Sequence, residues 1–272
     1  MGMNRLWSGS AVPRVSVAIL FSIAAGVHAA RAQAPPAAAQ QPAKSATAAL
    51  PGARSILDRH LTAVGGRDAI LAHSSTKATG VFSVASAGLT GTLEVFAAKP
   101  NKNLVRIQLP GVGEIVEGFD GTHGWTVSAM TGPMLLEGKQ LEEKKFDADF
   151  HAELHDDARY ESMTTMEVTD FDGRACYKLR LVKKGGGEDF EFYDVKTGLR
   201  AGRTGTRETP MGTVTGTAVE GDYRKFGKLL LPTSIRNTLM GTEQVITIKT
   251  VEFDTVPANA FEPPAAIKAL LK

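Results

Sequence analysis

Two histidines four residues apart are the first candidates for chemistry in this sequence. The spacing would place His151 and His155 on one face of a helix, and Asp156 and Asp157 follow directly. Neutral imidazoles so spaced can bind zinc. A metalloprotease motif, however, needs glutamate directly after the first histidine, and here Glu153 is offset by one position. We therefore expect polar residues at a helix end, with no metal, and keep a metal-dependent hydrolase using this pair as an alternative.

Other catalytic patterns find no support in the sequence. Residues 185–187 are three glycines between two predicted strands, without the Lys-Ser/Thr of a phosphate-binding loop, and this indicates a hairpin turn. There is no Gly-x-Ser-x-Gly nucleophile motif. The single cysteine, Cys176, excludes an intramolecular disulfide and a zinc site built from cysteines. The residues therefore give only negative evidence for catalysis.

The composition is typical of a folded domain and shows no excess of basic residues that would bind nucleic acid. The chain has 272 residues, of which 43% are hydrophobic, enough for one full core plus processing segments. Its 31 Lys and Arg and 29 Asp and Glu are interspersed, for a net charge of +2. Nucleic-acid binding would need basic residues gathered on one face, so we expect no nucleic-acid partner.

The first part of the chain has the features of an export signal. Arg5 and Arg14 precede an apolar run at 15–27, and an Ala-x-Ala site ends at Ala32. The run is short for a membrane span, so we predict a signal peptide over 1–32, cleaved near Ala32; a retained amphipathic anchor is the alternative. Residues 33–52 are an Ala/Pro/Gln tract that we expect to be a disordered linker. The folded domain would then span 53–272.

The rest of the chain alternates between strands and a few helices. Apolar residues at helical spacing predict a helix from Ala53 that ends at Gly65-Gly66, and a second short helix follows. A longer helix is predicted over 135–154, with Lys144 and Lys145 on its solvated face. Most other segments are rich in β-branched and aromatic residues that end at glycine or Asp-Gly turns. Strands are predicted near 76–84, 93–96, 104–109, 114–119, 125–127, 160–170, 175–183, 189–195, 213–223, 231–240 and 243–253.

These elements predict an α+β fold. Its centre would be a strongly curved antiparallel sheet of about ten or more strands, forming an incomplete β-barrel around a hydrophobic cavity. The N-terminal helices would cover the sheet, and the mid-chain helix would form a lid over its open face. A fully packed core with no cavity is the alternative, and residue periodicity does not separate the two.

The order of several short motifs resembles the periplasmic lipoprotein-carrier family with the LolA/LolB-like fold, and the broader group of outer-membrane lipoprotein-sorting proteins. The motifs are Lys99-Pro100-Asn101-Lys102, Gly113-Glu114-Ile115-Val116, Phe119-Asp120-Gly121-Thr122 with Trp125, and the tail Ala260-Phe261-Glu262-Pro263-Pro264. The resemblance covers most of the chain from Ala53 onward. In that family an arginine precedes the first proline and helps to latch the lid; here Lys99 takes its place, and lysine cannot make the same forked hydrogen bonds.

The resemblance implies a protein that is not an enzyme and needs no cofactor, and that binds a lipid or acylated lipoprotein in the periplasm and shuttles it between inner and outer membranes. Membrane-bound donor and acceptor proteins would be the partners of a monomeric carrier. A ligand-free interaction module is the alternative. We expect Phe146 and Phe150 on the lid and Lys99 as its latch. The predicted cavity lining consists of Phe82, Val84, Leu93, Val95, Leu104, Trp125, Leu179, Phe190 and Phe192.

Overall fold

The computed structural model describes residues 49–209 and 212–272. The predicted signal peptide and nearly all of the predicted linker lie outside the described residues. Helix α1 begins at Ala53, where the sequence predicts the first helix. No helix in the described ranges is long and apolar enough to cross a membrane.

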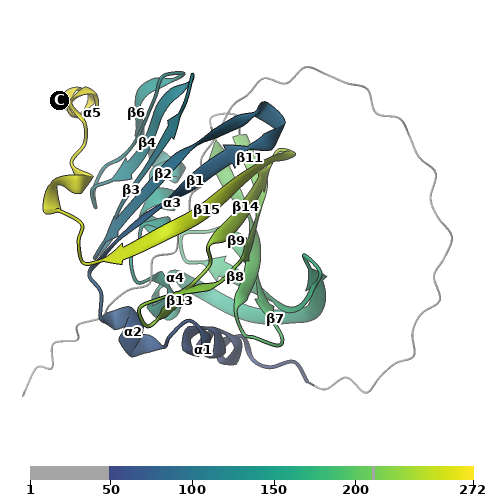
Figure 1. The fold of residues 1–272 in the computed structure, drawn as a ribbon. Helices are drawn as coiled ribbons and strands as arrows, with labels where there is room; N and C mark the ends of the chain where they lie inside the picture. The colour runs from purple at the N-terminus through teal and green to yellow at the C-terminus, as the bar shows by residue number, and fades with distance from the viewer. Residues whose placement is uncertain (1–48, 210–211) are drawn as a thin grey trace, which may run out of the picture.

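The centre of the fold is one antiparallel sheet of 13 strands (Figure 1). Its strands follow the order β6-β5-β4-β3-β2-β1-β15-β14-β11-β10-β9-β8-β7. Strands β1 to β6 and β7 to β15 thus form two meanders that join where β1 pairs with β15. The sheet is not closed, because β6 and β7 remain as its two edges. The predicted α+β fold, an incomplete barrel with few helices, is confirmed.

The bounds of the elements are as follows. The first meander consists of β1 Ser75–Val84, β2 Leu89–Ala98, β3 Lys102–Leu109, β4 Gly113–Phe119, β5 Gly124–Ser128 and β6 Gly132–Leu136. The second consists of β7 Tyr160–Phe171, β8 Arg174–Lys183, β9 Glu188–Asp194, β10 Arg200–Thr209, β11 Gly212–Gly221, β14 Ser234–Leu239 and β15 Thr242–Phe253, with the separate hairpin β12 Arg224–Phe226 and β13 Leu229–Leu231. The helices are α1 Ala53–Ala63, α2 Arg67–Leu71, α3 Gly138–Asp147, α4 Asp156–Arg159 and α5 Ala265–Leu270, with short 3₁₀ turns η1 Ala85–Ala87, η2 Ala152–Leu154 and η3 Ala258–Phe261.

The glycine run between β8 and β9 forms the hairpin turn that the sequence predicts. Gly186 and Gly187 both have positive φ, at 88° and 79°, which glycine adopts without steric cost. The backbone N–H of Lys183 donates to the carbonyl of Gly187 at 3.0 Å and closes the turn. This turn fixes the register in which Leu179 lies opposite Glu191.

The concave face of the sheet carries the largest apolar cluster. Phe82 pairs across the strands with Ile246 of β15, and Ile246 pairs with Ile235 of β14, so all three side chains share this face. The cluster continues into β2 and β3 through Leu93 and Ile107, which also lie opposite one another. All of these side chains are buried.

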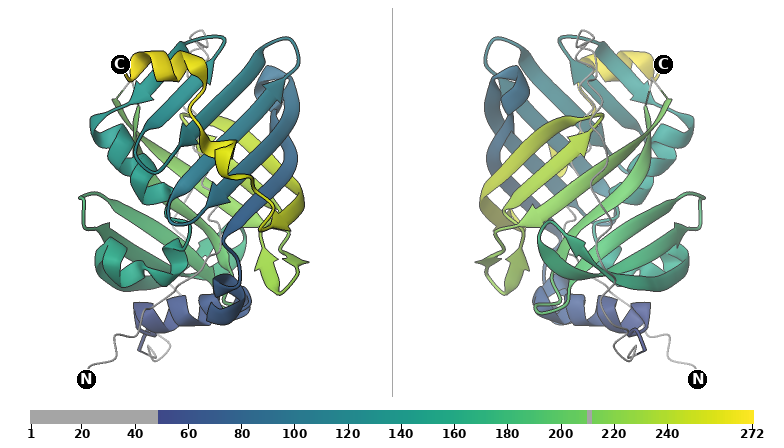
Figure 2. Two further views of the ribbon diagram at one scale, coloured as in Figure 1. Left: turned by 90° about the vertical axis from the view of Figure 1, so that its left-hand side faces the viewer. Right: turned by 90° about the vertical axis from the view of Figure 1, so that its right-hand side faces the viewer.

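The convex face is covered at one end by the C-terminal segment. Phe261 of η3 and Ile267 of α5 are buried against Leu104 of β3 and Trp125 of β5. Figure 2 shows this segment, in yellow, crossing the outside of the first meander. The first meander is therefore packed on both faces, which explains the apolar residues on both sides of its strands.

The helices cover the concave side and one end of the curved sheet. Helices α1 and α2 lie at the end where β7 to β9 and the β12–β13 hairpin also lie (Figures 1 and 2). Helix α3 contacts both β5 and β10, from opposite halves of the sheet, so it crosses the open concave side as the predicted lid helix does.

The lid helix is shorter than predicted. The sequence predicts a helix over 135–154, but α3 spans only Gly138–Asp147. Before it, residues 132–136 pair with β5 as an edge strand. After it, the backbone N–H of Phe150 donates to the carbonyl of Pro100 at 3.1 Å, so the chain leaves the helix to follow the sheet.

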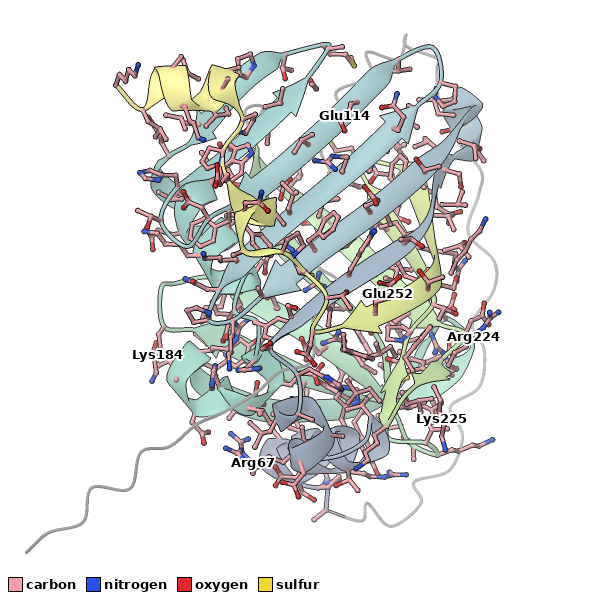
Figure 3. The ribbon with its side chains drawn as sticks, turned by 60° about the vertical axis from the view of Figure 1, so that its left-hand side comes forward. Arg67, Glu114, Lys184, Arg224, Lys225 and Glu252 are labelled. Atoms are coloured by element: carbon pink, nitrogen blue, oxygen red, sulfur yellow. The ribbon has the colours of Figure 1, made fainter. Side chains whose placement is uncertain are left out.

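Charged residues of both signs are spread over the outside of the molecule (Figure 3). Arg67, Glu114, Lys184 and Glu252, on four different parts of the chain, are all exposed. This distribution agrees with the interspersed charges in the sequence.

Candidate functional site

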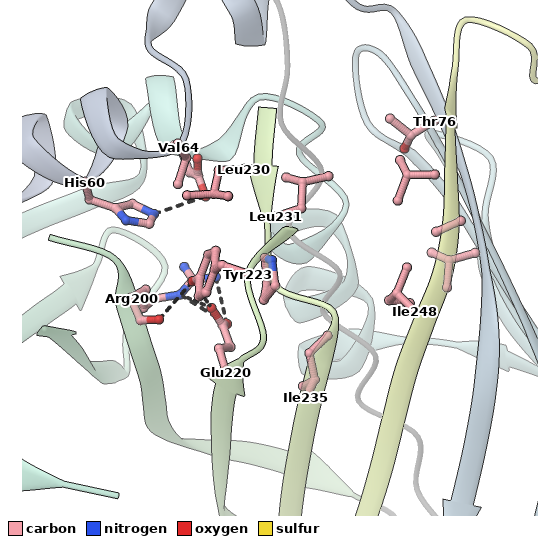
Figure 4. A pocket seen from close by; sticks show the side chains of 15 residues that line it. His60, Val64, Thr76, Arg200, Glu220, Tyr223, Leu230, Leu231, Ile235 and Ile248 are labelled. Carbon is pink, nitrogen blue, oxygen red and sulfur yellow. Dashed lines mark hydrogen bonds and ion pairs between the residues drawn. The ribbon is translucent and has the colours of Figure 1, made fainter. Parts of the chain in front are cut away.

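A pocket lies on the concave side, at the end of the sheet that α1 and the β12–β13 hairpin cover (Figure 4). It has two chemically different walls. The apolar wall consists of Val64, Ala78, Val95, Leu230, Leu231, Pro232, Ile235, Ile248 and Val251. The polar side consists of His60, Thr76, Glu153, Arg200, Glu220 and Tyr223.

Strand register explains why the two walls meet. Ala78 of β1 lies opposite both Val95 and Val251, so this side of the pocket is continuously apolar. Across β14, Ile235 lies opposite Glu220 of β11, where the lining changes from apolar to charged. The pocket is thus amphipathic because neighbouring strands place different residue types at the same level.

Arg200 is the centre of the polar wall, and two carboxylates hold it. Its Nε lies 3.1 Å from both carboxylate oxygens of Glu220, and its Nη2 donates to Oε1 at 2.9 Å. Its Nη1 approaches Glu191 at 3.5 Å, and the Tyr193 hydroxyl donates to the other oxygen of Glu191. Burial opposes the charge of the guanidinium, but Glu220 and Glu191 outweigh it and raise the pKa of Arg200 well above its ordinary value.

Tyr223 completes this group from the loop after β11. Its hydroxyl donates to the backbone carbonyl of Arg200 at 2.8 Å and lies 3.2 Å from Oε2 of Glu220. Burial, together with the negative charge of Glu220, raises the pKa of Tyr223 well above its ordinary value. Tyr223 is therefore a neutral hydroxyl at the edge of the pocket.

His60 of α1 and Glu153 of η2 form the rest of the polar side. His60 Nδ1 lies 3.1 Å from the carbonyl oxygen of Gly198, and only the ring nitrogen can donate in that pair. Its Nε2 lies 3.8 Å from a carboxylate oxygen of Glu153. The side chains are 6% and 10% exposed, so this contact is largely removed from water. The ring also packs edge-on against Tyr193, with centroids 5.1 Å apart.

The pocket is narrow in this conformation. Its cavity volume is about 40 Å³. A single water molecule needs at least about 10–15 Å³ on this measure, so a few waters would fill it. A longer apolar ligand would enter only if the surrounding side chains or helices moved apart.

Helix α3 is tied to the sheet by a lysine that the sequence suggests is solvated. Lys144 is buried, and its Nζ donates to Glu117 at 2.6 Å and to Oδ1 of Asn103 at 2.8 Å. Glu117 and Asn103 lie on the concave faces of β4 and β3, as the pairing of Val105 with Glu117 requires. The expectation of a solvated Lys144 is wrong, because the lid helix turns this side chain inward to meet a carboxylate.

The two predicted lid phenylalanines have different surroundings. Phe146 is half-buried near the end of α3, and its ring meets Tyr160 edge-on with centroids 5.8 Å apart. The guanidinium of Arg159 lies 3.7 Å over the same ring, and Lys183 lies 5.2 Å from it. Phe150 follows the helix, is 1% exposed and packs against Ala97 of β2.

The predicted cavity lining divides between the two faces of the sheet. Phe82, Val84, Leu93 and Val95 belong to the concave apolar cluster, and Val95 borders the pocket. Leu179 is also on the concave side, in a cluster with Leu57 of α1.

The remaining four predicted residues lie on the convex side. Leu104 and Trp125 pack under the C-terminal segment. Phe190 and Phe192 pair with Arg180 and Lys178, while Leu179 pairs with Glu191 on the other face. Phe192 stacks on Phe171 at 4.0 Å between ring centroids. Cys176 is buried in the same cluster, and burial raises its pKa to about 11.

The two histidines of the alternative metal site do not share a helix face. His151 precedes the short turn η2 and His155 follows it, with ring centroids 6.0 Å apart. Asp149 accepts from Nδ1 of His155 at 3.1 Å and from Arg159 at 3.2 Å. Among the described residues, no group of three or more His, Cys, Asp or Glu side chains could hold a metal ion.

His151 is buried and lies near the predicted latch residue. Burial lowers its pKa to about 4, and the charges of His155 and Lys99 contribute in the same direction. Lys99 itself is exposed, and within the described ranges no ion pair joins it to α3. Asp156, the first residue of α4, is also buried, with Arg54 of α1 3.8 Å away.

Sequence reasoning missed the polar wall of the pocket. Arg200 opens β10, a strand rich in Gly, Thr and Arg that shows no apolar alternation. His60 looks like an ordinary helix histidine, and Glu220 and Tyr223 look like strand-end residues. The only sequence signal is that a charged residue occupies an inward position on each of three consecutive strands in the sheet, at Glu191, Arg200 and Glu220.

Comparison with known proteins identifies the fold. No protein-family model matches the sequence, and no curated protein matches it. Among solved structures, a LolA superfamily protein from Nitrosomonas europaea aligns over 79% of this chain and 99% of its own, with a TM-score of 0.53 and 13% identity. A DUF1329 family protein from Desulfovibrio piger aligns over 79% and 98%, with a TM-score of 0.55 and 14% identity.

A putative outer membrane lipoprotein-sorting protein domain from Vibrio parahaemolyticus is similar to the same extent. It aligns over 80% of this chain and 97% of its own, with a TM-score of 0.51 and 13% identity. At these identities the likeness concerns the fold and not the site residues. The curved open sheet, its lid helix and these neighbours together show that the chain has a LolA-like fold.

Proposed function

We propose that this protein is an exported, non-catalytic carrier that binds a lipid or the acyl group of a lipoprotein in the pocket of the curved sheet. The observation that carries the proposal is the amphipathic pocket, with one apolar wall and one buried polar wall. Such a lining suits a molecule with an apolar chain and a polar end.

The export signal predicted from the sequence and the fold support the same role. A signal peptide over 1–32 would deliver the domain to the periplasm. One solved neighbour is described as a lipoprotein-sorting domain, and its fold likeness extends over most of this chain. Carriage between inner and outer membranes, with membrane-bound donor and acceptor proteins, is part of the proposal.

Binding would require the pocket to open. A cavity of about 40 Å³ is too small for an acyl chain. Helix α3 crosses the concave side and is joined to the sheet through Lys144, so displacement of this helix would enlarge the space. We therefore assign the described conformation to a closed state of the carrier.

A fluorescent probe tests this function. N-phenyl-1-naphthylamine is uncharged and fluoresces strongly in apolar surroundings, so we expect the mature protein to enhance its emission with saturation. Leu230 lies in the β12–β13 hairpin and is only partly buried, so Leu230→Trp should fill the pocket without unfolding the sheet. We expect this variant to weaken probe binding at least tenfold.

The matched control is Leu230→Met, which conserves volume and should bind like the parent. Circular dichroism and thermal unfolding would establish that both variants fold. Equal probe binding by the Trp and Met variants would show that this pocket is not the binding site. A parent protein without saturable binding would support the ligand-free interaction module.

A further inference from the structure

We propose that the β12–β13 hairpin is a docking surface for an anionic phospholipid bilayer. This inference goes beyond the proposed function, because it names a second interaction surface and the class of lipid that the surface meets. It follows from the shape of the hairpin and from the exposed cations that it carries.

The hairpin projects from the body of the molecule next to α1 and α2 (Figure 2). Phe226 pairs with Leu229, so Gly227 and Lys228 form a two-residue turn between the strands. Such a turn needs positive φ, and Gly227 adopts a φ of 59°. The turn therefore places Lys228 at the tip of a projecting element.

The hairpin carries positive charge that no carboxylate neutralises. Arg224, Lys225 and Lys228 are exposed, and within residues 49–209 and 212–272 no ion pair or hydrogen bond joins their side chains to another residue. Asp222 is the one acidic residue in positions 222–231, so three cations and one carboxylate leave a net charge of +2. Figure 3 shows Arg224 and Lys225 at this end, and Glu252 on the sheet, where it lies opposite a lysine of β1.

The charges of the neighbouring helices do not offset these cations. Helix α1 meets the hairpin at its C-terminal end, where the N–H of Leu230 donates to the carbonyl of Val64 at 2.9 Å. The acidic residues beside Arg54 are at the other end of α1. They lie about 15 Å away, because a helix rises about 1.5 Å per residue, and salt largely screens exposed charges that far apart. On α2, the charges of Arg67 and Asp68 sum to zero.

This chemistry suits a bilayer better than an acidic protein. Leu229 and Leu231 of the hairpin are buried against Val64 and Ile70, so they cannot supply the apolar centre of a specific protein interface. The exposed cations remain, and an anionic bilayer attracts such residues without requiring a fixed shape. Leu230 lines the pocket, so docking here would place the pocket next to the bilayer, a link that rests on the proposed function.

Vesicle flotation provides the test. The mature protein would be mixed at pH 7.5 with vesicles of phosphatidylethanolamine and phosphatidylglycerol, or with vesicles of phosphatidylcholine alone. We expect binding to the anionic vesicles only, and its loss at high salt. Each cation near an anionic surface contributes about fivefold to the affinity. The double variant Lys225→Gln with Lys228→Gln should therefore bind the anionic vesicles at least tenfold more weakly.

The matched control is Lys268→Gln with Lys272→Gln. It removes the same charge from two exposed lysines in and after α5, which lies at the other end of the molecule from α1 and α2 (Figure 1). This control should bind the anionic vesicles like the parent. Both double variants should bind N-phenyl-1-naphthylamine like the parent when no vesicles are present, so the docking proposal can fail while the carrier function stands.

Two results would overturn the proposal. One is equal vesicle binding by the two double variants, which would place the contact elsewhere on the protein. The other is a parent protein that does not bind the anionic vesicles. If that parent binds soluble polyglutamate instead, and the hairpin variant does not, the hairpin is a site for an acidic protein and not for a membrane.

Discussion

Arg200 holds the polar wall together because two buried carboxylates share one guanidinium. Removing either side of a buried ion pair leaves an uncompensated charge, and the cost depends on how many charges are stranded. Loss of Glu220 would still leave Glu191 beside Arg200, whereas loss of Arg200 would take the guanidinium away from both carboxylates. Loss of Arg200 should therefore destabilise the fold more than loss of Glu220 does.

We expect Arg200→Met to lower the free energy of unfolding by about 3–5 kcal/mol. Glu220→Gln, which keeps a hydrogen-bond acceptor next to the guanidinium, should cost about 1–3 kcal/mol. Urea unfolding of both variants at pH 7.5 measures the difference. A Glu220→Gln variant less stable than Arg200→Met would contradict the arrangement described.

His151 makes stability depend on pH in a defined window. Its pKa is about 4 in the folded state, against about 6.5 for an ordinary histidine. Above pH 6.5 the ring is neutral in both states, so its contribution is fully present. As the pH falls from 6.5 to 4 the unfolded chain takes up the proton first, and stability falls by up to about 3 kcal/mol.

His151→Gln should remove this dependence, so its stability relative to the parent should improve steadily between pH 6.5 and pH 4. Urea unfolding at four pH values would measure the trend. A constant difference in the free energy of unfolding between His151→Gln and the parent, from pH 6.5 to pH 4, would refute the assignment of this pH dependence to His151.

At the scale of elements, strands with apolar alternation could be predicted, and strands with polar inward positions could not. The Asp120-Gly121 turn and the glycine run before β9 mark hairpins that form as expected. Strand β10 was missed because Arg200 and Arg203 take its inward positions and glycines interrupt it. The apolar alternation that marks the predicted strands is absent there, since this strand builds the polar wall.

The face of the sheet on which each side chain lies could be predicted only in part. Apolar residues usually face a core, but this sheet has apolar cover on both sides. Leu104 and Trp125 pack under Phe261, which follows each of them by more than 130 positions in the sequence. Local periodicity carries no information about such a distant cover. Likewise, Lys144 looks solvated until the helix is placed over Glu117.

The attachment of α3 depends on Lys144. We expect Lys144→Met to leave Glu117, whose side chain is only 18% exposed, without its cation, so α3 should open more easily. Hydrogen–deuterium exchange over residues 138–147 should accelerate at least tenfold, while β1 and β15 remain protected. Lys145→Met, at a side chain 42% exposed, should not change it. Equal exchange in both variants would show that Lys144 does not hold the helix.

At the scale of the whole molecule, two meanders meet at β1 and β15 and leave the sheet open at β6 and β7. The open concave side needs a cover, and α1, α3 and the β12–β13 hairpin together provide it. The pocket lies among elements from both meanders and the first helix. Its shape therefore depends on the positions of these covering elements relative to the sheet. A cover made of separate short elements is suited to opening and closing around a ligand.

The most direct test of the carrier account is native mass spectrometry of mature protein purified from an exporting host, with lipid extraction of the same sample. The account predicts a second mass that exceeds the polypeptide by one lipid or acyl-containing molecule, and its loss in Leu230→Trp but not in Leu230→Met. A single mass equal to the polypeptide alone, with no lipid in the extract and none taken up on addition, would contradict it.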